Sequence, residues 1–170
     1  MNAGWGSHMP SEESAQGGLS TDEKRQNVIR LVFGSQPERF DEFCRILQAS
    51  IPPGTKVVLR GSAVTGERWD DGAPFDAAGS GTSDLDLTLV GKEAVALFRL
   101  NGFFIPGIHS RPLSDDDPEI APELIELRRR LSAMVGRAVN IQATLDFVMY
   151  LRGDLLGQPY LTIVGDQDAA

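Results

Sequence analysis

Apolar residues recur at helical spacing in three parts of the chain, and each part carries a start or stop signal. Residues 20–23 (STDE) have the spacing of a capping box and predict the start of a first helix. Ser35 as a possible cap and Pro37 as an early helical position predict a second helix to about Gln48. The spacing of alanine, leucine and isoleucine predicts a long third helix over 118–137.

Alternating apolar and polar residues predict strands between and after these helices. The segments are 55–60, 84–90 and 138–150, the last being the longest, with a possible fourth strand over 159–165. A further helix is expected over 92–100. Because helices and strands are mixed without a regular βαβ series, the predicted fold class is α+β, a small mixed β-sheet flanked by helices packed on one side.

Two long segments show no periodicity. Residues 61–83 begin like a short turn or helix and continue as a loop rich in Gly, Ala and Asp, and loops this long are often functional. Residues 103–118 are expected to be irregular. Residues 1–9 contain GSHM, which looks like a cloning scar, and 10–19 are polar and small, so 1–19 is interpreted as a scar and disordered leader before one domain, 20–170.

Composition narrows the classes of protein. No segment approaches the roughly 18 apolar residues of a membrane span, so a soluble protein without membrane contact is expected. The single cysteine, Cys44, lies in a helical pattern as a small core residue and fits a reducing, cytoplasmic compartment. The net charge of −8 argues against general binding of duplex nucleic acid, and two histidines are too few for a His-based zinc site.

The sequence GTSDLDLTLVG places two acids inside an otherwise apolar run. Side chains alternate along a strand, so Asp84, Asp86 and Thr88 share the face opposite the leucines. Two neighbouring carboxylates repel each other unless water or a divalent cation lies between them. Hard oxygen ligands suit Mg²⁺ or Mn²⁺, so this pair predicts a metal site.

The third predicted strand repeats the pattern, with Asn140, Gln142, Thr144 and Asp146 on its polar face. If this strand neighbours the first acidic strand, three carboxylates converge. Three converging carboxylates can hold two metal ions, an arrangement suited to in-line phosphoryl or nucleotidyl transfer.

A phosphate-binding element is predicted where the first strand ends. Gly61 allows the backbone to approach a phosphate, and the Ser62 hydroxyl and the N–H groups of a helix start can bind phosphate oxygens. Arg60 or Arg68 would add positive charge. A second glycine pair, at 79–81, is a rival cradle and is interpreted as a hinge before the next strand.

A strand that ends in Gly-Ser, then an Asp-x-Asp strand, then a lone Asp on a later strand resembles the DNA polymerase β-like nucleotidyltransferase superfamily. The resemblance covers about residues 55–150. It implies that Asp84 and Asp86 bind both metals, that Asp146 binds the catalytic metal and helps to activate an acceptor hydroxyl, and that residues 61–62 hold the phosphates. The implied reaction moves an NMP from an NTP to a protein, an RNA end such as that of tRNA, or a small molecule, and releases pyrophosphate.

The chain departs from the family pattern in two ways. Twenty-one residues separate Ser62 from Asp84, about twice the usual gap in compact members, so residues 68–79 resemble an insertion. Only a short segment follows Asp146, with no sign of the helical domain that such members often carry. Contacts to the base and the acceptor would then come from the long helix, from 103–118, from a homodimer mate or from a helical partner protein.

Plain structural alternatives stand beside each of these interpretations. The Asp84 and Asp86 pair could be a solvated strand start, Asp146 an exposed strand residue, and 61–62 a simple turn. In the long loop, Trp69 and Phe75 could stack on a base or pack the loop onto the core.

Two other functions compete with transfer. One is a non-catalytic module that senses nucleotides or binds a partner while retaining the fold. The other is a metal phosphoesterase, although such sites usually recruit histidines and this chain offers only His109.

Overall fold

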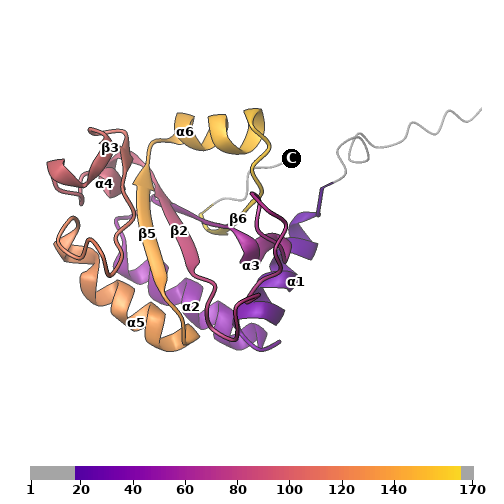
Figure 1. Ribbon diagram of the computed structural model, residues 1–170. Coiled ribbons are helices and arrows are strands. Elements are labelled where there is room, and N and C mark those ends of the chain that lie inside the picture. The colour runs from indigo at the N-terminus through magenta and orange to yellow at the C-terminus, as the bar shows by residue number, and fades with distance from the viewer. Residues whose placement is uncertain (1–17, 166–170) are drawn as a thin grey trace, which may run out of the picture.

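Six strands form one mixed sheet in the order β3-β4-β5-β2-β1-β6 (Figure 1). The structure is a computed structural model and describes residues 18–165, so the interpretation of residues 1–17 as scar and leader lies outside the described residues. Strands β2 and β5 are parallel, and the other neighbouring pairs are antiparallel. The strands are β1 (Lys56–Arg60), β2 (Leu85–Val90), β3 (Phe103–Ile105), β4 (His109–Ser110), β5 (Val139–Thr144) and β6 (Tyr160–Val164).

The helices vary from single turns to almost four turns. They are α1 (Thr21–Val32), α2 (Pro37–Ser50), α3 (Ser62–Thr65), α4 (Lys92–Val95), α5 (Ile125–Val135) and α6 (Asp146–Tyr150), with 3₁₀ turns η2 (Leu100–Gly102) and η3 (Pro122–Leu124) and a π-helical segment η4 (Leu151–Leu155). The capping box of α1 is confirmed, because Ser20 and Glu23 exchange both expected hydrogen bonds. The predicted cap of α2 is wrong: Ser35 has a positive φ, and Gln36 is the residue before the helix.

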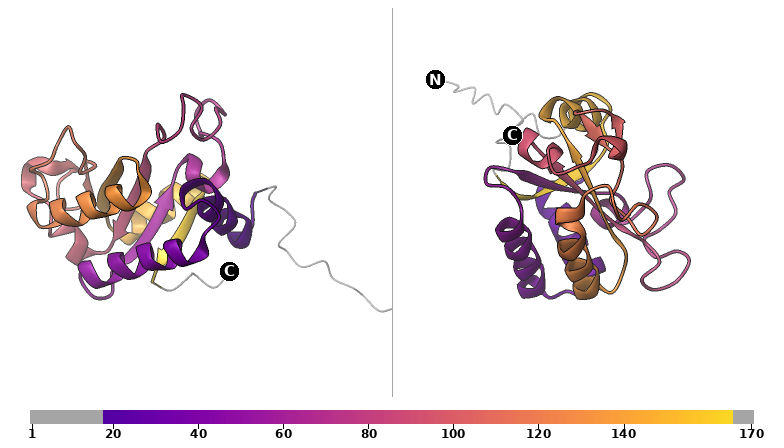
Figure 2. Two further views of the ribbon diagram at one scale, coloured as in Figure 1. Left: turned by 90° about the horizontal axis from the view of Figure 1, so that it is seen from below. Right: turned by 90° about the vertical axis from the view of Figure 1, so that its left-hand side faces the viewer.

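One face of the sheet carries the hydrophobic core. Helices α1, α2 and α5 pack against this face, as Figures 1 and 2 show from three directions. The alternating leucines of β2 are buried here as predicted, together with Val57 and Leu59 of β1 and the apolar positions of β5. Cys44 packs at the margin of this core, and burial raises the pKa of its thiol to about 12, which confirms its structural role.

The opposite face of the sheet is only partly covered. Helix α6 crosses it at one end, where Met149 and Tyr160 pack against Val58 and Val90. The prediction that helices lie on one side is therefore correct for the core helices and wrong for α6. The remainder of this face is open and carries the polar residues of the candidate site.

The third predicted strand is shorter than its sequence pattern indicates. Strand β5 ends at Thr144, opposite Val90, where its partner β2 also ends. The apolar and polar alternation continues to Phe147, but the chain turns at Leu145 and enters α6. Asp146 occupies the first turn of that helix, where a carboxylate is favoured by the helix dipole.

The segment 103–118 is not wholly irregular. It contains the short hairpin β3–β4 at the edge of the sheet, and Leu113 then forms a single bridge with Ile141. Strands of two or three residues are too short to show alternation, which explains why they were missed. The helix predicted over 92–100 is also shorter, with α4 ending at Val95. No helix within residues 18–165 is long and apolar enough to cross a membrane.

One ion pair fastens the long loop before β2 to the sheet. The guanidinium of Arg137 donates to both oxygens of Asp76, at 2.8 and 3.1 Å, and to the carbonyl of Ser83 at 2.8 Å. It also lies over the Phe75 ring, 4.5 Å from its centroid. Asp76 in turn accepts from the backbone N–H groups of Gly81 and Ser83, so the pair fixes the loop directly before the acidic strand.

Replacing Arg137 with methionine should reduce the free energy of unfolding by about 3 kcal/mol, because it leaves a mostly buried carboxylate without its partner. Arg137 holds the pKa of Asp76 well below its ordinary value, so the pair contributes stability above the unfolded pKa and loses it as pH falls. The variant should lack this acid-dependent loss. Urea unfolding measured at several acid pH values tests the loss of stability and its pH dependence. The exposed Arg129→Met is the control. Equal stability of the two variants would show that the Arg137–Asp76 ion pair does not stabilise the fold.

Candidate functional site

The turn after β1 lies directly against the acidic strand. Arg60 is paired with Asp86 across β1 and β2, and Gly61 follows with φ +88°. A Cβ on Gly61 would lie 3.4 Å from Asp86 Oδ2, in a backbone conformation that side chains rarely adopt. The glycine thus brings the chain past the carboxylate without a side chain between them.

Asn140 faces both acids from the neighbouring strand. It is the register partner of Asp86 in the parallel pair β2–β5. Its side-chain amide donates to Asp84 Oδ2 and to Asp86 Oδ1, both at 3.2 Å. A neutral amide, and not a third carboxylate, is therefore the group that faces the two acids from β5.

Asp146 does not join the other two acids, and the predicted convergence of three carboxylates is wrong. The strand that was to carry it ends at Thr144, level with Val90 at the opposite end of β2 from Asp84. Asp146 is exposed on α6 and lines a separate cavity of about 270 Å³, which Lys56 and Tyr160 also line. Within residues 18–165, no three acid, histidine or cysteine side chains are grouped to hold a metal ion.

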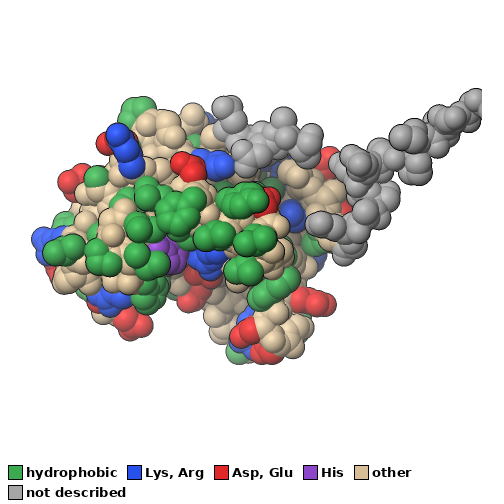
Figure 3. Space-filling view, turned by 90° about the horizontal axis from the view of Figure 1, so that it is seen from above, with side chains coloured by type: hydrophobic (Ala, Val, Ile, Leu, Met, Phe, Trp, Pro, Cys, Tyr) green, Lys and Arg blue, Asp and Glu red, His purple; other side chains and the backbone are tan. Residues whose placement is uncertain are grey.

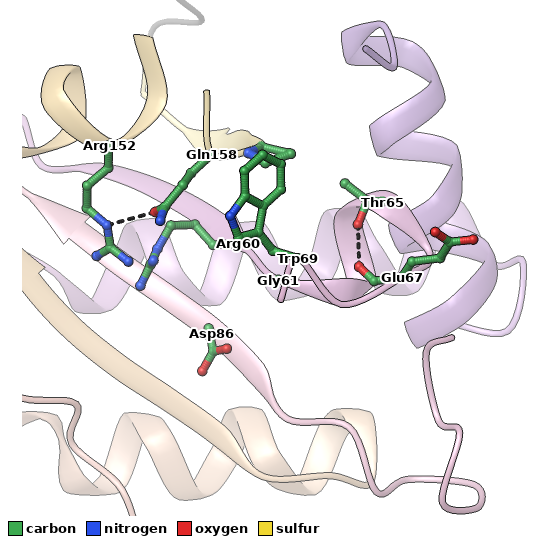
Figure 4. Close-up of a pocket in the computed structure, with 9 residues that line it drawn as sticks. Arg60, Gly61, Thr65, Glu67, Trp69, Asp86, Arg152 and Gln158 are labelled. Atoms are coloured by element: carbon green, nitrogen blue, oxygen red, sulfur yellow. Dashed lines mark hydrogen bonds between the residues drawn. The ribbon is translucent and has the colours of Figure 1, made fainter. Parts of the chain in front are cut away.

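Two guanidinium groups converge above Asp86. Arg60, at the end of β1, donates to Thr88 Oγ1 at 3.1 Å and to Gln142 Oε1 at 3.0 Å. Arg152, in η4, donates to the side-chain oxygen of Gln158 at 3.1 Å. Figure 4 shows both guanidinium groups pointing toward one another, with the Asp86 carboxylate beneath them.

These two cations are electrostatically unfavourable where they lie. The pKa of Arg60 is lowered to about 10, first by burial and then by the charge of Arg152, while Asp86 opposes both effects. Burial likewise lowers the pKa of Arg152. Among the residues that the structure describes, neither group forms an ion pair. A polyanion placed between them would relieve both penalties, and guanidinium groups suit phosphate.

The ionised form of Asp86 is also unfavourable where it lies. Burial raises its pKa, the Asn140 amide and Arg60 act in the opposite direction, and the charge of Asp84 raises it again. A divalent cation between the two carboxylates would offset this cost. Two carboxylates are hard ligands that fit Mg²⁺ or Mn²⁺, and Mg²⁺ is usually held by one or two carboxylates plus phosphates. The residues fit one such cation better than the predicted two-metal site.

Arg152 is held over the sheet by an unusually close contact. The π-helical segment η4 that carries it packs onto Tyr160 of β6 through Gly153. A Cβ on Gly153 would lie 2.4 Å from the Tyr160 ring, so a side chain there would require the segment or the ring to shift. Such π-helical segments are rare and are frequent at functional sites.

These elements enclose an open cleft of about 220 Å³. It lies between the end of β1, the start of β2, the loop after α3 and the segment after α6 (Figure 4). Its lining residues are Arg60, Gly61, Thr65, Glu67, Trp69, Asp86, Arg152, Gln158 and Pro159. The cleft therefore combines two acids, two guanidinium groups, a glycine turn and an exposed indole.

No protein-family model, curated protein or solved structure matches the chain. The superfamily assignment therefore remains a prediction that depends on the glycine turn and the two acids.

Two of the predicted phosphate ligands have other contacts. Arg68 is exposed and makes a two-point ion pair with Asp71, its neighbour in the same loop, and it does not line the cleft. Ser62 is buried as the first residue of α3, and its carbonyl accepts from Gly66. Of the four predicted residues, Arg60 and Gly61 are the two that line the cleft.

Sequence reasoning did not assign a role to Asn140, Arg152 or Gln158. Asn140 was placed on the correct face, but the strand register that aligns it with Asp86 has no local signal. His109, the one histidine that a metal phosphoesterase site could have used, lies on the open face, where Thr144 and Gln142 contact its ring at 3.1 and 3.3 Å. Burial, and then the two nearby guanidinium groups, lower the pKa of His109, so it is neutral in this setting.

Apolar side chains surround the open face. Figure 3 shows them as a green band around the basic and imidazole groups. Those exposed on α6, η4 and β3 are Phe147, Tyr150, Leu151, Leu155, Phe104 and Ile105. The surroundings of the cleft are therefore more apolar than the acidic composition of the whole chain suggests.

Proposed function

We propose that the cleft binds a nucleoside triphosphate with Mg²⁺ or Mn²⁺ and transfers its nucleoside monophosphate to a hydroxyl acceptor. The observation that carries this proposal is the close approach of the Gly61 turn to Asp86. Two guanidinium groups without ion-pair partners among the described residues lie over this carboxylate. This arrangement supplies the Asp86 carboxylate in the cleft, with Asp84 beside it as a second ligand for a cation, and positive charge for a polyphosphate from Arg60 and Arg152.

Each group has a distinct role in the proposal. Asp84 and Asp86 would hold the cation, which supplies charge neutralisation at the phosphates and activation of the acceptor hydroxyl. Arg60 and Arg152 bind the phosphate oxygens, and Gly61 lets the backbone approach them. Asn140 holds the two carboxylates on one side of the cleft through its amide.

The proposed reaction is an in-line displacement at the α-phosphorus. The acceptor oxygen forms a new bond to this phosphorus while the bond to the oxygen that bridges the α- and β-phosphates breaks. Pyrophosphate carries away that electron pair, held by Arg60 and Arg152. The acceptor's proton passes to Asp84, the more exposed carboxylate, or to water.

Asn140 favours a second candidate function, a module that binds nucleotides without transferring them. An amide at this position cannot accept the acceptor's proton and adds no negative charge to hold a second cation. Nucleotide binding would then remain metal-dependent, while pyrophosphate release would be absent.

The surroundings of the cleft favour a protein acceptor over RNA. Exposed apolar side chains on α6, η4 and β3 form a rim next to the cleft. Apolar patches mark protein contacts more often than nucleic-acid contacts, and a net charge of −8 repels a long polyanion. A small-molecule acceptor or a homodimer mate would contact the same exposed apolar side chains.

A label-transfer assay tests the proposal. Each of the four α-labelled NTPs is incubated with Mg²⁺ or Mn²⁺ and cell lysate, and pyrophosphate release is measured in parallel. Label on a macromolecule or small molecule that is lost in Asp84→Ala/Asp86→Ala supports transfer and names both base and acceptor. Metal-dependent binding without label supports the sensing module, and absence of both refutes the proposed site.

Replacing Asp146 with asparagine should change nucleotide binding and transfer by less than about twofold, because its carboxylate lies at the far end of β2. The same assay measures the effect, with Asp84→Asn as the positive control. A loss comparable to that control would show that α6 moves Asp146 into the cleft, and would restore the three-acid arrangement expected from sequence.

A further inference from the structure

Trp69 is exposed although it belongs to an ordered loop. Its side chain is 64% exposed, among the highest values for large apolar residues described. The sequence alternatives were stacking on a base or packing of the loop onto the core. Phe75 takes the packing role, since it is half-buried beneath Arg137 and contacts the core. Trp69 has no comparable role in the core.

The loop around Trp69 is braced by its own hydrogen bonds. The Arg68 N–H donates to the Ala73 carbonyl at 2.8 Å, and the Gly72 N–H donates to the Arg68 carbonyl at 3.0 Å. Asp71 accepts from the Arg68 guanidinium and from the Ala73 N–H. These bonds brace the backbone on both sides of Trp69, so the loop does not need the indole as a packing group.

The indole faces the cleft. Trp69 lines it together with Arg60, Gly61 and Gln158, and Figure 4 shows the ring between the glycine turn and the Gln158 side chain. The guanidinium groups and Asp86 lie on one side of it. A planar group attached to a polyphosphate could therefore reach the indole while its phosphates reach Arg60 and Arg152.

We infer that Trp69 is the stacking surface for the nucleobase of the bound nucleoside triphosphate. This inference rests on the proposed function, because it takes the phosphates to lie at the guanidinium groups. Stacking on an indole accepts any base, since every base has a π-face, so Trp69 supplies affinity for nucleotides over simple polyphosphates. Gln158 lies beside it with a side-chain amide able to contact the base edge or the ribose.

Fluorescence can report this contact directly. Trp5 is the other tryptophan of the chain, so a Trp5→Phe background leaves Trp69 as the single emitter. ATP, GTP, CTP and UTP are titrated in the presence of Mg²⁺, with inorganic triphosphate as the probe that lacks a base. Quenching by the nucleotides and not by triphosphate is the expected result.

Calorimetric titration of variants provides the second readout. Trp69→Ala should weaken NTP binding about tenfold, as base-aromatic stacking predicts, and leave inorganic triphosphate binding unchanged. Trp69→Phe should recover part of the affinity. Leu100→Ala, which removes another exposed apolar side chain outside the cleft lining, should bind both ligands normally.

The outcomes separate this inference from the proposed function. Unchanged NTP affinity in Trp69→Ala, or an equal loss for NTP and triphosphate, overturns the stacking role while metal-dependent binding by the wild type upholds the site. Wild-type protein that binds neither ligand overturns both. If Trp69→Ala loses affinity for NTP but not for triphosphate, and nucleotides quench Trp69 fluorescence, both the stacking role and the proposed nucleotide site are supported.

Discussion

Replacing Asp86 with asparagine should weaken metal-dependent nucleotide binding about 100-fold or more and, at neutral pH without metal, should stabilise the protein. The loss follows because a neutral amide replaces a carboxylate ligand, and changes even to the partners of metal ligands commonly cost 10–100-fold. The gain follows because the buried charge of Asp86 is unfavourable until a cation joins it.

The pH dependence of stability distinguishes this explanation from a general packing effect. The pKa of Asp86 is raised in the folded state, so its contribution to stability is complete below the unfolded pKa and is lost as pH rises through the folded pKa. The advantage of Asp86→Asn should therefore grow from acid to neutral pH. Thermal unfolding with a chelator measures it, and added Mg²⁺ should favour the wild type instead.

Asp84→Asn is the matched control, since Asp84 is exposed and its charge is solvated. It should lose metal binding with little change in metal-free stability. Equal stabilisation by both substitutions, or none by Asp86→Asn, would mean that the buried charge of Asp86 does not destabilise the metal-free protein.

Replacing Asn140 with aspartate should tighten Mn²⁺ or Mg²⁺ binding about tenfold or more. The Asn140 amide already lies 3.2 Å from both carboxylates, so the substitution places a third acid beside them, a role that the family resemblance assigned to Asp146. Greater ligand charge raises affinity for a hard cation. Without metal, three neighbouring carboxylates repel each other, and the variant should be less stable than the wild type.

Calorimetry with Mn²⁺ measures the metal affinity. Thermal unfolding with and without chelator compares the stability of the variant and the wild type in the metal-free and metal-bound states. Asn140→Ala separates loss of the amide from gain of charge and should weaken metal binding slightly. If transfer by the wild type is slow, Asn140→Asp should accelerate it. A variant with unchanged metal affinity would contradict the arrangement of the site.

The parts of the fold that could be predicted have local causes. The capping box at Ser20 and the alternating leucines of β2 each specify their element from neighbouring residues alone. The same holds for the short turn after β1, whose Gly61 needs a positive φ. The face on which Asp84 and Asp86 lie follows from alternation, and the structure agrees.

What could not be predicted depends on contacts between distant segments. The end of β5 is set by the length of its partner β2, while alternation continues to Phe147 and misplaces Asp146 on a strand. Arg68 is captured by the nearby Asp71, a local competitor that the phosphate interpretation overlooked. Arg152 reaches the cleft only because the chain folds back over the sheet, which no spacing in the sequence reports.

The contact between Gly153 and Tyr160 has a consequence for how the cleft can change. Because Gly153 has no Cβ, the segment that carries Arg152 can pack closely on the Tyr160 ring of β6. Any side chain at 153 would force either this segment or the Tyr160 ring to shift, and a shift of the segment would move Arg152 relative to Arg60. The position of Arg152 over the cleft therefore depends on the glycine that follows it.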